Sequence, residues 1–355
     1  MYEGFSDFRI HNISLSNPYD VKMVKAFADK YHIDYVPEEA DRTIIMETTS
    51  GDIVGTGSTL GNVIKTVIVD EKFQGSNAFS KIVSTLSEIL LKEHKHIFIY
   101  THPKNKHLFT GLGFNCLAEA PPHYLLFEFG FHTMNKYQEY LKSLAAEGNP
   151  ESSALVMNCN PFTYGHQFLI EKASSESKVV YLFVVETEKS IFPFATRWEL
   201  IKKGTAHLDN VIMVKTDDYL VSRVSFPKYF LKDTHADEIT ANQARLDLTV
   251  FIDHIAPILN IKKRYVGTEN YCVTTASYNH EMKELLPKHG IEVEEVKRKA
   301  LGVDDYISAS KIRKALKEDA WETIHEKVPQ TTYDFLKSDE AKEIIANIKS
   351  SDSRH

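Results

Sequence analysis

Two short segments, far apart in the sequence, carry residue types that suit a chain of phosphates. The first, residues 158–166 (NCNPFTYGH), follows an apolar run and precedes a helical pattern. The second, residues 307–313 (ISASKIR), has the hydroxyls and cations of a helix start. Because free backbone N–H groups at a helix N-terminus attract anions, the two segments together predict that the protein uses a nucleoside triphosphate as a reagent.

In the first segment, a turn at Asn160 leads to Gly165, which lets the backbone approach a ligand closely. His166 begins the predicted helix, so its imidazole and the helix-terminal N–H groups face one anion. Fixed donors of this kind stabilise the charge that develops at an α-phosphate during transfer. The structural alternative is that Thr163 only caps the helix and His166 is incidental. The place of the segment after a first buried strand favours the phosphate site.

In the second segment, Ser308 or Ser310 can cap a helix that we expect to begin near Lys311. Lys311 and Arg313 place two positive charges in the first turn, where cations oppose the helix dipole. A bound β,γ-phosphate would explain these charges. The alternative is a surface helix with solvated side chains.

Composition narrows the class of protein. The 355 residues suit two domains, and 43% hydrophobic with 26% charged residues is typical of a globular protein. A net charge of −7 argues against nucleic acid as a main partner. The three cysteines are widely separated, which predicts reduced thiols and no metal site: Cys116, Cys159 and Cys272.

The chain shows no sign of membrane insertion or export. The first residues lack the basic start and apolar stretch of a signal peptide. No window approaches 18 apolar residues. We therefore expect a cytoplasmic protein with no membrane partner.

Hydrophobic patterning predicts the elements that position these segments. The first part reads as strands at 43–47, 53–60, 63–69, 97–100 and 124–129, with a helix at 79–90. A connecting helix at 134–146 and the sequence EGNP predict domains at 1–147 and 148–355. The second part alternates strands at 154–157, 179–185, 211–214 and 291–296 with helices at 166–173, 197–208 and 278–286. Such alternation predicts a parallel sheet with helices on both faces and ligands beyond the carboxyl ends of its strands.

The two segments resemble the HxGH and ISSTxxR motifs of the nucleotidyltransferase superfamily, with Thr163 in place of the first histidine. With the strings 224–230 (VSFPKYF) and 265–269 (YVGTE), nearly the whole chain resembles the citrate lyase ligase family. That family implies an α/β fold: a Rossmann-like (HUP, nucleotidyltransferase) parallel-sheet domain preceded by a smaller α+β domain like GNAT acetyltransferases.

The resemblance implies an ATP-dependent ligase. It would activate acetate as acetyl-adenylate, release pyrophosphate, and acetylate the prosthetic-group thiol of the citrate lyase acyl carrier protein, which activates citrate lyase. The implied cofactors are ATP and its bound Mg²⁺, and the implied prosthetic group is of the dephospho-CoA type. Since the thiol belongs to the partner, Cys159 is expected to be only a small buried residue.

The resemblance also implies roles for single residues. Four would hold the ATP phosphates and stabilise the transition state: His166, Thr163, Lys311 and Arg313. Others would line the ATP site: Asn158, Asn160, Phe162, Gly165, Gly267, Thr268, Glu269, Ser308 and Ser310. Three further cations could clamp acetate or a phosphate, or form structural ion pairs instead: Arg197, Arg223 and Lys228.

Residues 73–79 (FQGSNAF) resemble the acetyltransferase loop that binds CoA. Gln74 fits that loop, but Asn77 and Phe79 stand where glycine or a small residue is expected. A pyrophosphate needs bare backbone N–H groups there. We therefore expect a retained fold with two alternative uses: binding acetyl-CoA, which the altered loop disfavours, or docking the carrier protein or its prosthetic group.

Three other functions are compatible with parts of the pattern. An adenylyltransferase acting on a phosphopantetheine-like substrate would use the same motifs. An N-acetyltransferase with a nucleotide-sensing domain is disfavoured by the altered CoA loop. A non-catalytic nucleotide-binding regulator would be expected to lose His166 or the pair Lys311 and Arg313, and this chain keeps them.

Overall fold

The computed structural model describes residues 8–122, 124–186, 190–222, 224, 238–269, 272–297 and 306–350. The chain divides into two compact units, Met1–Thr133 and Met134–His355. Helix α4 (Met134–Leu144) groups with the second unit, so the two units divide before this helix. The boundary predicted after residue 147 lies on the other side of the helix.

A mixed sheet forms the first unit, with the order β1-β2-β3-β4-β5-β7-β6 in the described residues. Only β4 and β5 run parallel among these neighbours, and they pair through Val63 with Phe98 and Ile64 with Ile99. The strands are β1 (Arg9–Asn12), β2 (Arg42–Glu47), β3 (Ile53–Leu60), β4 (Val63–Val69), β5 (His96–Thr101), β6 (Asn115–Ala120) and β7 (Tyr124–Gly130). The helices are α1 (Pro18–Asp29), α2 (Ala78–Leu90) and α3 (Lys106–Thr110).

Helix α2 lies close to the sheet because β3 carries glycines beneath it. A Cβ added at Gly57 would come within 2.7 Å of a methyl carbon of Leu86. Ile82, Val83 and Leu86 of α2 are buried in one core with strand residues such as Ile44. The predicted strands and the helix at 79–90 are confirmed, whereas β1, α1 and β6 were not predicted.

The second unit is built on a parallel sheet with the order β10-β9-β8-β11-β12. Its strands are β8 (Ser152–Met157), β9 (Val180–Val184), β10 (Val211–Lys215), β11 (Ile261–Gly267) and β12 (Glu292–Val296). The helices besides α4 are α5 (Tyr164–Glu176), α6 (Phe194–Gly204), α7 (Glu238–Val250), α8 (Val273–Leu285), α9 (Ala309–Lys317), α10 (Trp321–Lys327), α11 (Gln330–Lys337) and α12 (Lys342–Ser350). The predicted parallel sheet is confirmed.

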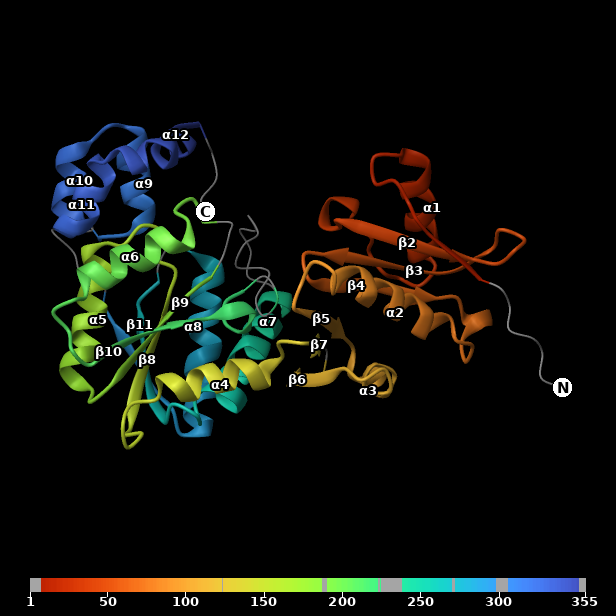
Figure 1. Cartoon of the computed structure of the whole chain (residues 1–355), viewed down its shortest axis with the longest axis horizontal. Coiled ribbons are helices and arrows are strands. Elements are labelled where there is room, and N and C mark those ends of the chain that lie inside the picture. Colours follow the sequence, from red (N-terminus) through yellow and green to blue (C-terminus); the bar gives the residue numbers. More distant parts are fainter. Residues whose placement is uncertain are drawn as a thin grey trace. The chain divides into compact units, whose positions relative to one another are not determined.

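Helices cover both faces of this sheet, as neighbouring residues of β11 show. The guanidinium of Arg264 lies over the rings of Phe251 and Tyr278, 4.7 and 5.6 Å from their centroids. The next residue, Tyr265, donates from its hydroxyl to Glu176 of α5 at 2.8 Å. Because successive strand residues point to opposite faces, α5 lies on one face and α8 on the other (Figure 1).

Strand order locates the ligand edge. Relative to the chain, the order runs outward in both directions from β8, first through β9 and β10 and later through β11 and β12. The reversal therefore falls between β8 and β11, and ligands of such sheets bind beyond the carboxyl ends of the strands at this point. Met157 ends β8 and Gly267 ends β11, so the predicted motifs at 158–166 and 267–269 begin there.

The C-terminal helices α9 to α12 share a core of their own, which includes Ile312, Leu316, Ile324 and Leu336. Figure 1 shows them in blue, grouped beside α6. Among the described helices, none combines the length and apolar composition that a bilayer crossing requires.

Candidate active site

Thr163 and His166 form a reciprocal cap at the start of α5. The Thr163 hydroxyl accepts a hydrogen bond from the His166 backbone N–H at 3.4 Å, and His166 Nδ1 accepts from the Thr163 N–H at 3.1 Å. A histidine thus takes the place of the Glu or Gln usual in a capping box. Thr163 is 1% exposed, so its contacts are those of a cap, and its direct binding of phosphate stays a prediction.

This cap also sets the protonation pattern of His166. Because Nδ1 accepts from a backbone N–H, the proton of the neutral ring resides on Nε2. The ring is half-buried and stacks at 16° to the ring of Phe162, with centroids 6.0 Å apart. His166 is therefore an oriented N–H donor at a helix N-terminus.

The two predicted motifs meet in space. Arg313 of α9 donates from Nη1 to the main-chain carbonyl of Asn160. A Cβ added at Gly165 would lie 3.0 Å from the carbonyl oxygen of Ile307 and 3.6 Å from its Cβ. The absence of a side chain at Gly165 thus lets the second segment lie directly against the start of α5.

The start of α9 presents the second group of donors. Ser308 caps it by accepting from the Lys311 N–H at 3.3 Å, and its hydroxyl lies 3.1 Å from that of Ser310. Lys311 and Arg313 are half-buried and flank the fully buried Ile312. The sequence prediction of a capped, cation-bearing helix start is confirmed, with α9 beginning at Ala309.

Arg197 of α6 is fully buried and binds the main chain at the strand ends. Its Nη1 donates to the carbonyls of Asn158 and Val185, both at 2.8 Å, and its Nε donates to the carbonyl of Phe192 at 3.0 Å. These contacts differ from the exposed ion pair considered from sequence. They give Arg197 a positioning role, and its contact with acetate stays a prediction.

The two asparagines of the motif connect it to the loop before α6. Asn158 Oδ1 accepts from the Ser190 hydroxyl, and Asn160 Oδ1 accepts from the Phe192 N–H, both at 3.0 Å. Because Oδ1 of Asn160 faces the Phe192 N–H, Nδ2 of the same amide points away from that group. Nδ2 is buried and has no hydrogen-bond partner among the described residues, which leaves a donor at this strand end.

At the end of β11, backbone contacts shape the other side of the switch point. The carbonyl of Gly267 accepts from Asn279 at 3.2 Å, and the Thr268 N–H donates to the Val296 carbonyl at 3.0 Å. Glu269 accepts from the Cys272 N–H at 3.0 Å, next to the start of α8. Gly267, Thr268 and Glu269 therefore lie at the carboxyl end of β11, at the same edge of the sheet as Asn158 at the end of β8.

Two residues of the motif face the core. Phe162 is fully buried, and a Cβ at Gly204 would meet its ring at 2.4 Å, so it supports the motif from below. Cys159 is 2% exposed, and burial raises the pKa of its thiol. A thiol in this state is a poor nucleophile. Phe162 as an ATP contact stays a prediction.

Two predicted site residues cannot be placed, and two residues near the motif were not predicted. Arg223 and Lys228, the other two predicted clamps, lie outside the described residues. Sequence reasoning did not single out Ser190, which donates to Asn158, or Phe192, which donates to Asn160. The signal that could have found them is their place between β9 and α6, at the same carboxyl edge as the motif.

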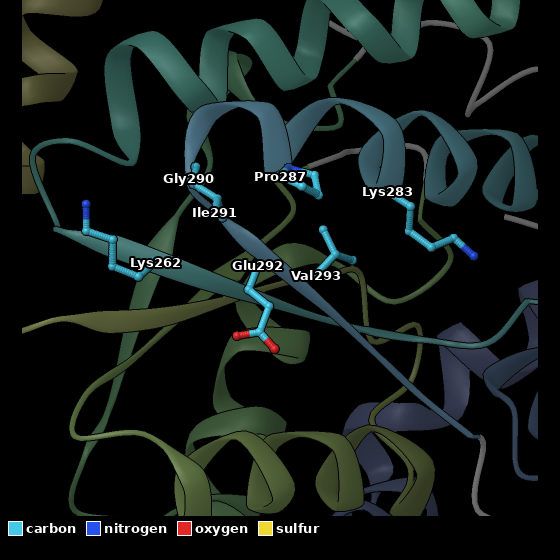
Figure 2. Close-up of a pocket in the computed structure, with 7 residues that line it drawn as sticks. All are labelled: Lys262, Lys283, Pro287, Gly290, Ile291, Glu292 and Val293. Atoms are coloured by element: carbon cyan, nitrogen blue, oxygen red, sulfur yellow. The ribbon is translucent and has the colours of Figure 1, made fainter.

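Two cavities among the described residues lie away from this site. One of about 650 Å³ lies at the amino-terminal ends of β11 and β12, at the opposite edge of the sheet (Figure 2). It is lined by Lys262, Lys283, Pro287, Gly290, Ile291, Glu292 and Val293. Another of about 480 Å³ lies in the first unit, between α1 and the turn that includes Asp52.

Residues 73–79, whose sequence resembles a CoA-binding loop, use the hydroxyl of Ser76 at the start of α2. Ser76 Oγ accepts from the Ala78 N–H at 3.2 Å and donates to the Phe73 carbonyl at 2.6 Å. Phe79 turns into the core and meets Phe109 edge-on, with centroids 5.2 Å apart. One of the N–H groups that a pyrophosphate would need is therefore already bound.

If the two motifs hold the predicted nucleoside triphosphate, Gly165→Ala should weaken its binding by about tenfold, because the new Cβ pushes the 307–313 segment away from α5. Alanine is favoured over glycine inside a helix by about 1 kcal/mol, so the melting temperature should not fall greatly. Titration calorimetry with ATP, paired with thermal denaturation, separates the two effects. Unchanged ATP affinity would contradict the close contact of the motifs.

Known proteins match most of this chain. The family model for the citrate lyase ligase C-terminal domain matches residues 152–336. A curated relative, the citrate (pro-3S)-lyase ligase of Haemophilus influenzae, is 36% identical over 307 residues, which cover 84% of this chain and 90% of the relative.

Two solved structures match parts of the chain. One is a putative acetyltransferase from Exiguobacterium sp. 255-15, with 11% identity, 35% of this chain and 93% of that chain covered, and a TM-score of 0.30. The other is a putative nicotinate-nucleotide adenylyltransferase from Vibrio parahaemolyticus, with 16% identity, 58% of this chain and 100% of that chain covered, and a TM-score of 0.33.

Proposed function

This chain belongs to the citrate lyase ligase family, and on that premise we propose that it uses ATP to activate acetate and acetylates the acyl carrier protein of citrate lyase. Acetylation of this carrier protein converts citrate lyase to its active form. The first product is acetyl-adenylate with release of pyrophosphate. The acceptor is the thiol of the carrier's prosthetic group, which we propose is of the dephospho-CoA type.

One observation carries the proposal: two helix N-termini converge at the switch point of the sheet. Arg313 reaches Asn160, and Gly165 lies against Ile307. The convergence gathers backbone N–H groups, an oriented imidazole and two cations. This donor set suits a polyphosphate, and the buried Nδ2 of Asn160 adds a donor without a described partner.

In the first step, an oxygen of acetate attacks the α-phosphorus, and the bond from that phosphorus to the bridging oxygen of pyrophosphate breaks. His166 Nε2–H and the first N–H groups of α5 stabilise the charge on the non-bridging α-oxygens. Lys311, Arg313 and the N-terminus of α9 hold the β- and γ-phosphates as pyrophosphate leaves. Thr163 keeps the imidazole of His166 in place through the cap.

We propose that Mg²⁺ enters with the nucleotide. Magnesium retains waters and binds through substrate phosphates in many ATP sites, and it supplies charge neutralisation there. The donors assembled here are cations and N–H groups, which fit the polyphosphate rather than a cage for the metal. No described residue is assigned as its ligand.

In the second step, the partner's thiolate attacks the acetyl carbonyl carbon, a thioester forms, and AMP leaves with the electron pair of the broken C–O bond. The described structure agrees with an external thiol. Cys159, the cysteine within the motif, is buried with a raised pKa. Cys159 is therefore not assigned as an acyl acceptor.

The test is pyrophosphate release from ATP with acetate, with phosphopantetheine or with neither, each with and without deacetylated carrier protein. The proposal expects release that depends on acetate and AMP formation that turns over only with the carrier. Acetate-independent release with phosphopantetheine would establish the adenylyltransferase instead. Acetyl-CoA consumption without ATP would establish the N-acetyltransferase.

Removal of divalent metal by EDTA is expected to abolish acetate-dependent pyrophosphate release, and excess Mg²⁺ should restore it. The reason is that the charge on the departing pyrophosphate needs neutralisation beyond that of Lys311 and Arg313. Full activity with metal-free ATP would contradict this requirement. Circular dichroism before and after EDTA serves as the control for folding.

A further inference from the structure

Phe192 lies in the loop between β9 and α6, yet its side chain belongs to the core of the C-terminal helices. It is fully buried there. Among the described residues, the other buried members of this core come from residues 312–348: Ile312, Ala315, Leu316, Ile324, Val328, Leu336, Ile344 and Ile348. Phe192 is thus the buried side chain that the sheet-side loop contributes to this core.

The main chain of Phe192 is fixed from the opposite direction. Its N–H donates to Asn160 Oδ1, and its carbonyl accepts from Arg197 Nε, both at 3.0 Å. Arg197 in turn binds the carbonyl of Asn158 at 2.8 Å. The position of Phe192 is therefore set by the first motif, whereas its side chain packs with the helices that carry the second.

Asn160 is linked to α9 in two ways. Its side chain binds the backbone of Phe192, whose ring shares a core with Ile312 of α9, and its carbonyl accepts directly from Arg313. Ile312 lies between Lys311 and Arg313 in the sequence. The position of its side chain in the core therefore determines the rotation of α9 about its axis and the distance from α9 to α5. A rotation about Ile312 would move both cations.

We propose that Phe192 is a positioning residue for the ligase reaction, which sets the placement of Lys311 and Arg313 against the Asn158–His166 motif. The inference rests on the proposed function, because it concerns ATP held between the two motifs. Phe192 itself touches no reacting atom. It acts through α9 on the phosphates.

The test compares Phe192→Ala with Leu336→Ala, a truncation in the same core on α11. Both leave a cavity, and both are expected to lose stability. At temperatures where each variant is fully folded, Phe192→Ala should lower kcat/KM for ATP in pyrophosphate release by at least about tenfold, because misplacement of binding groups is costly. Leu336→Ala should stay within about threefold of wild type. Phe192→Leu should recover part of the loss and stay measurably below wild type.

A double-mutant cycle separates positioning from loss of stability. Phe192→Leu combined with Arg313→Lys should depart from the product of the single effects, because both act on the same phosphate contacts, whereas Leu336→Ala with Arg313→Lys should multiply. The cycle uses the milder leucine variant and stands even if Phe192→Ala does not fold. Equal effects of Phe192 and Leu336 variants, together with a multiplicative cycle, would overturn the inference. Wild-type protein without acetate-dependent activity would instead sink the proposed function.

Discussion

His166→Ala is expected to lower the rate of acetate-dependent pyrophosphate release by about 10²-fold or more. The imidazole donates from Nε2, because Nδ1 is engaged by the Thr163 N–H at 3.1 Å. Removing it deletes a preorganised donor where charge develops in the transition state. The measurement is single-turnover pyrophosphate release at saturating ATP and acetate, which isolates the chemical step from binding.

Loss of the cap must be separated from loss of the donor. His166→Gln keeps a residue that can accept from the Thr163 N–H at this position of a capping box, so its stability should stay near that of the wild type while its rate remains low. His207→Ala provides a matched histidine control, since His207 is exposed and pairs with Glu171 at 3.0 Å. A His166→Ala enzyme with wild-type rate would refute the assigned role.

Arg313→Ala is expected to lower kcat/KM for ATP by about 10²-fold, because the substitution removes a phosphate contact and the tie between α9 and Asn160. Lys314→Ala is the matched control. It deletes the same charge from the next residue of α9, and that side chain is 75% exposed and pairs with Glu318 at the surface. Surface pairs of this kind contribute little, so activity should be unchanged.

Arg313→Lys refines this result, because lysine keeps the charge but lacks the planar guanidinium that binds a carbonyl and a phosphate together. An intermediate loss is expected from steady-state kinetics over a range of ATP concentrations. If Arg313→Ala and Lys314→Ala weaken ATP use equally, α9 acts only through its overall charge. That outcome would contradict the assigned site.

Strands β8, β9 and β10 of the second unit could be predicted because each contains a short apolar run between other elements. The start of α9 could be predicted because Ser308 caps it through local contacts. Helix α7 was missed, and its residues explain why. Ala244, Leu246, Asp247 and Leu248 are all buried, so the helix shows no clear polar face.

The contacts that assemble the site could not be predicted, because they join residues far apart in the chain. Arg313 and Asn160 are separated by 153 positions. Arg197 was considered a surface cation or clamp, yet burial and three carbonyl acceptors give it a structural task. Phe192 reads as an ordinary core residue until its helical neighbours are known. Local propensity and spacing contain no information on such pairings.

The most direct test of the central claim is the fate of oxygen from 18O-labelled acetate. If a carboxylate oxygen attacks the α-phosphorus at this site, thiol transfer breaks the acetyl C–O bond and leaves that oxygen on AMP. Mass spectrometry of AMP after turnover with deacetylated carrier protein should therefore find 18O in its phosphate, and the His166→Ala enzyme should form labelled AMP more slowly. Unlabelled AMP, or ADP as the nucleotide product, would contradict the account.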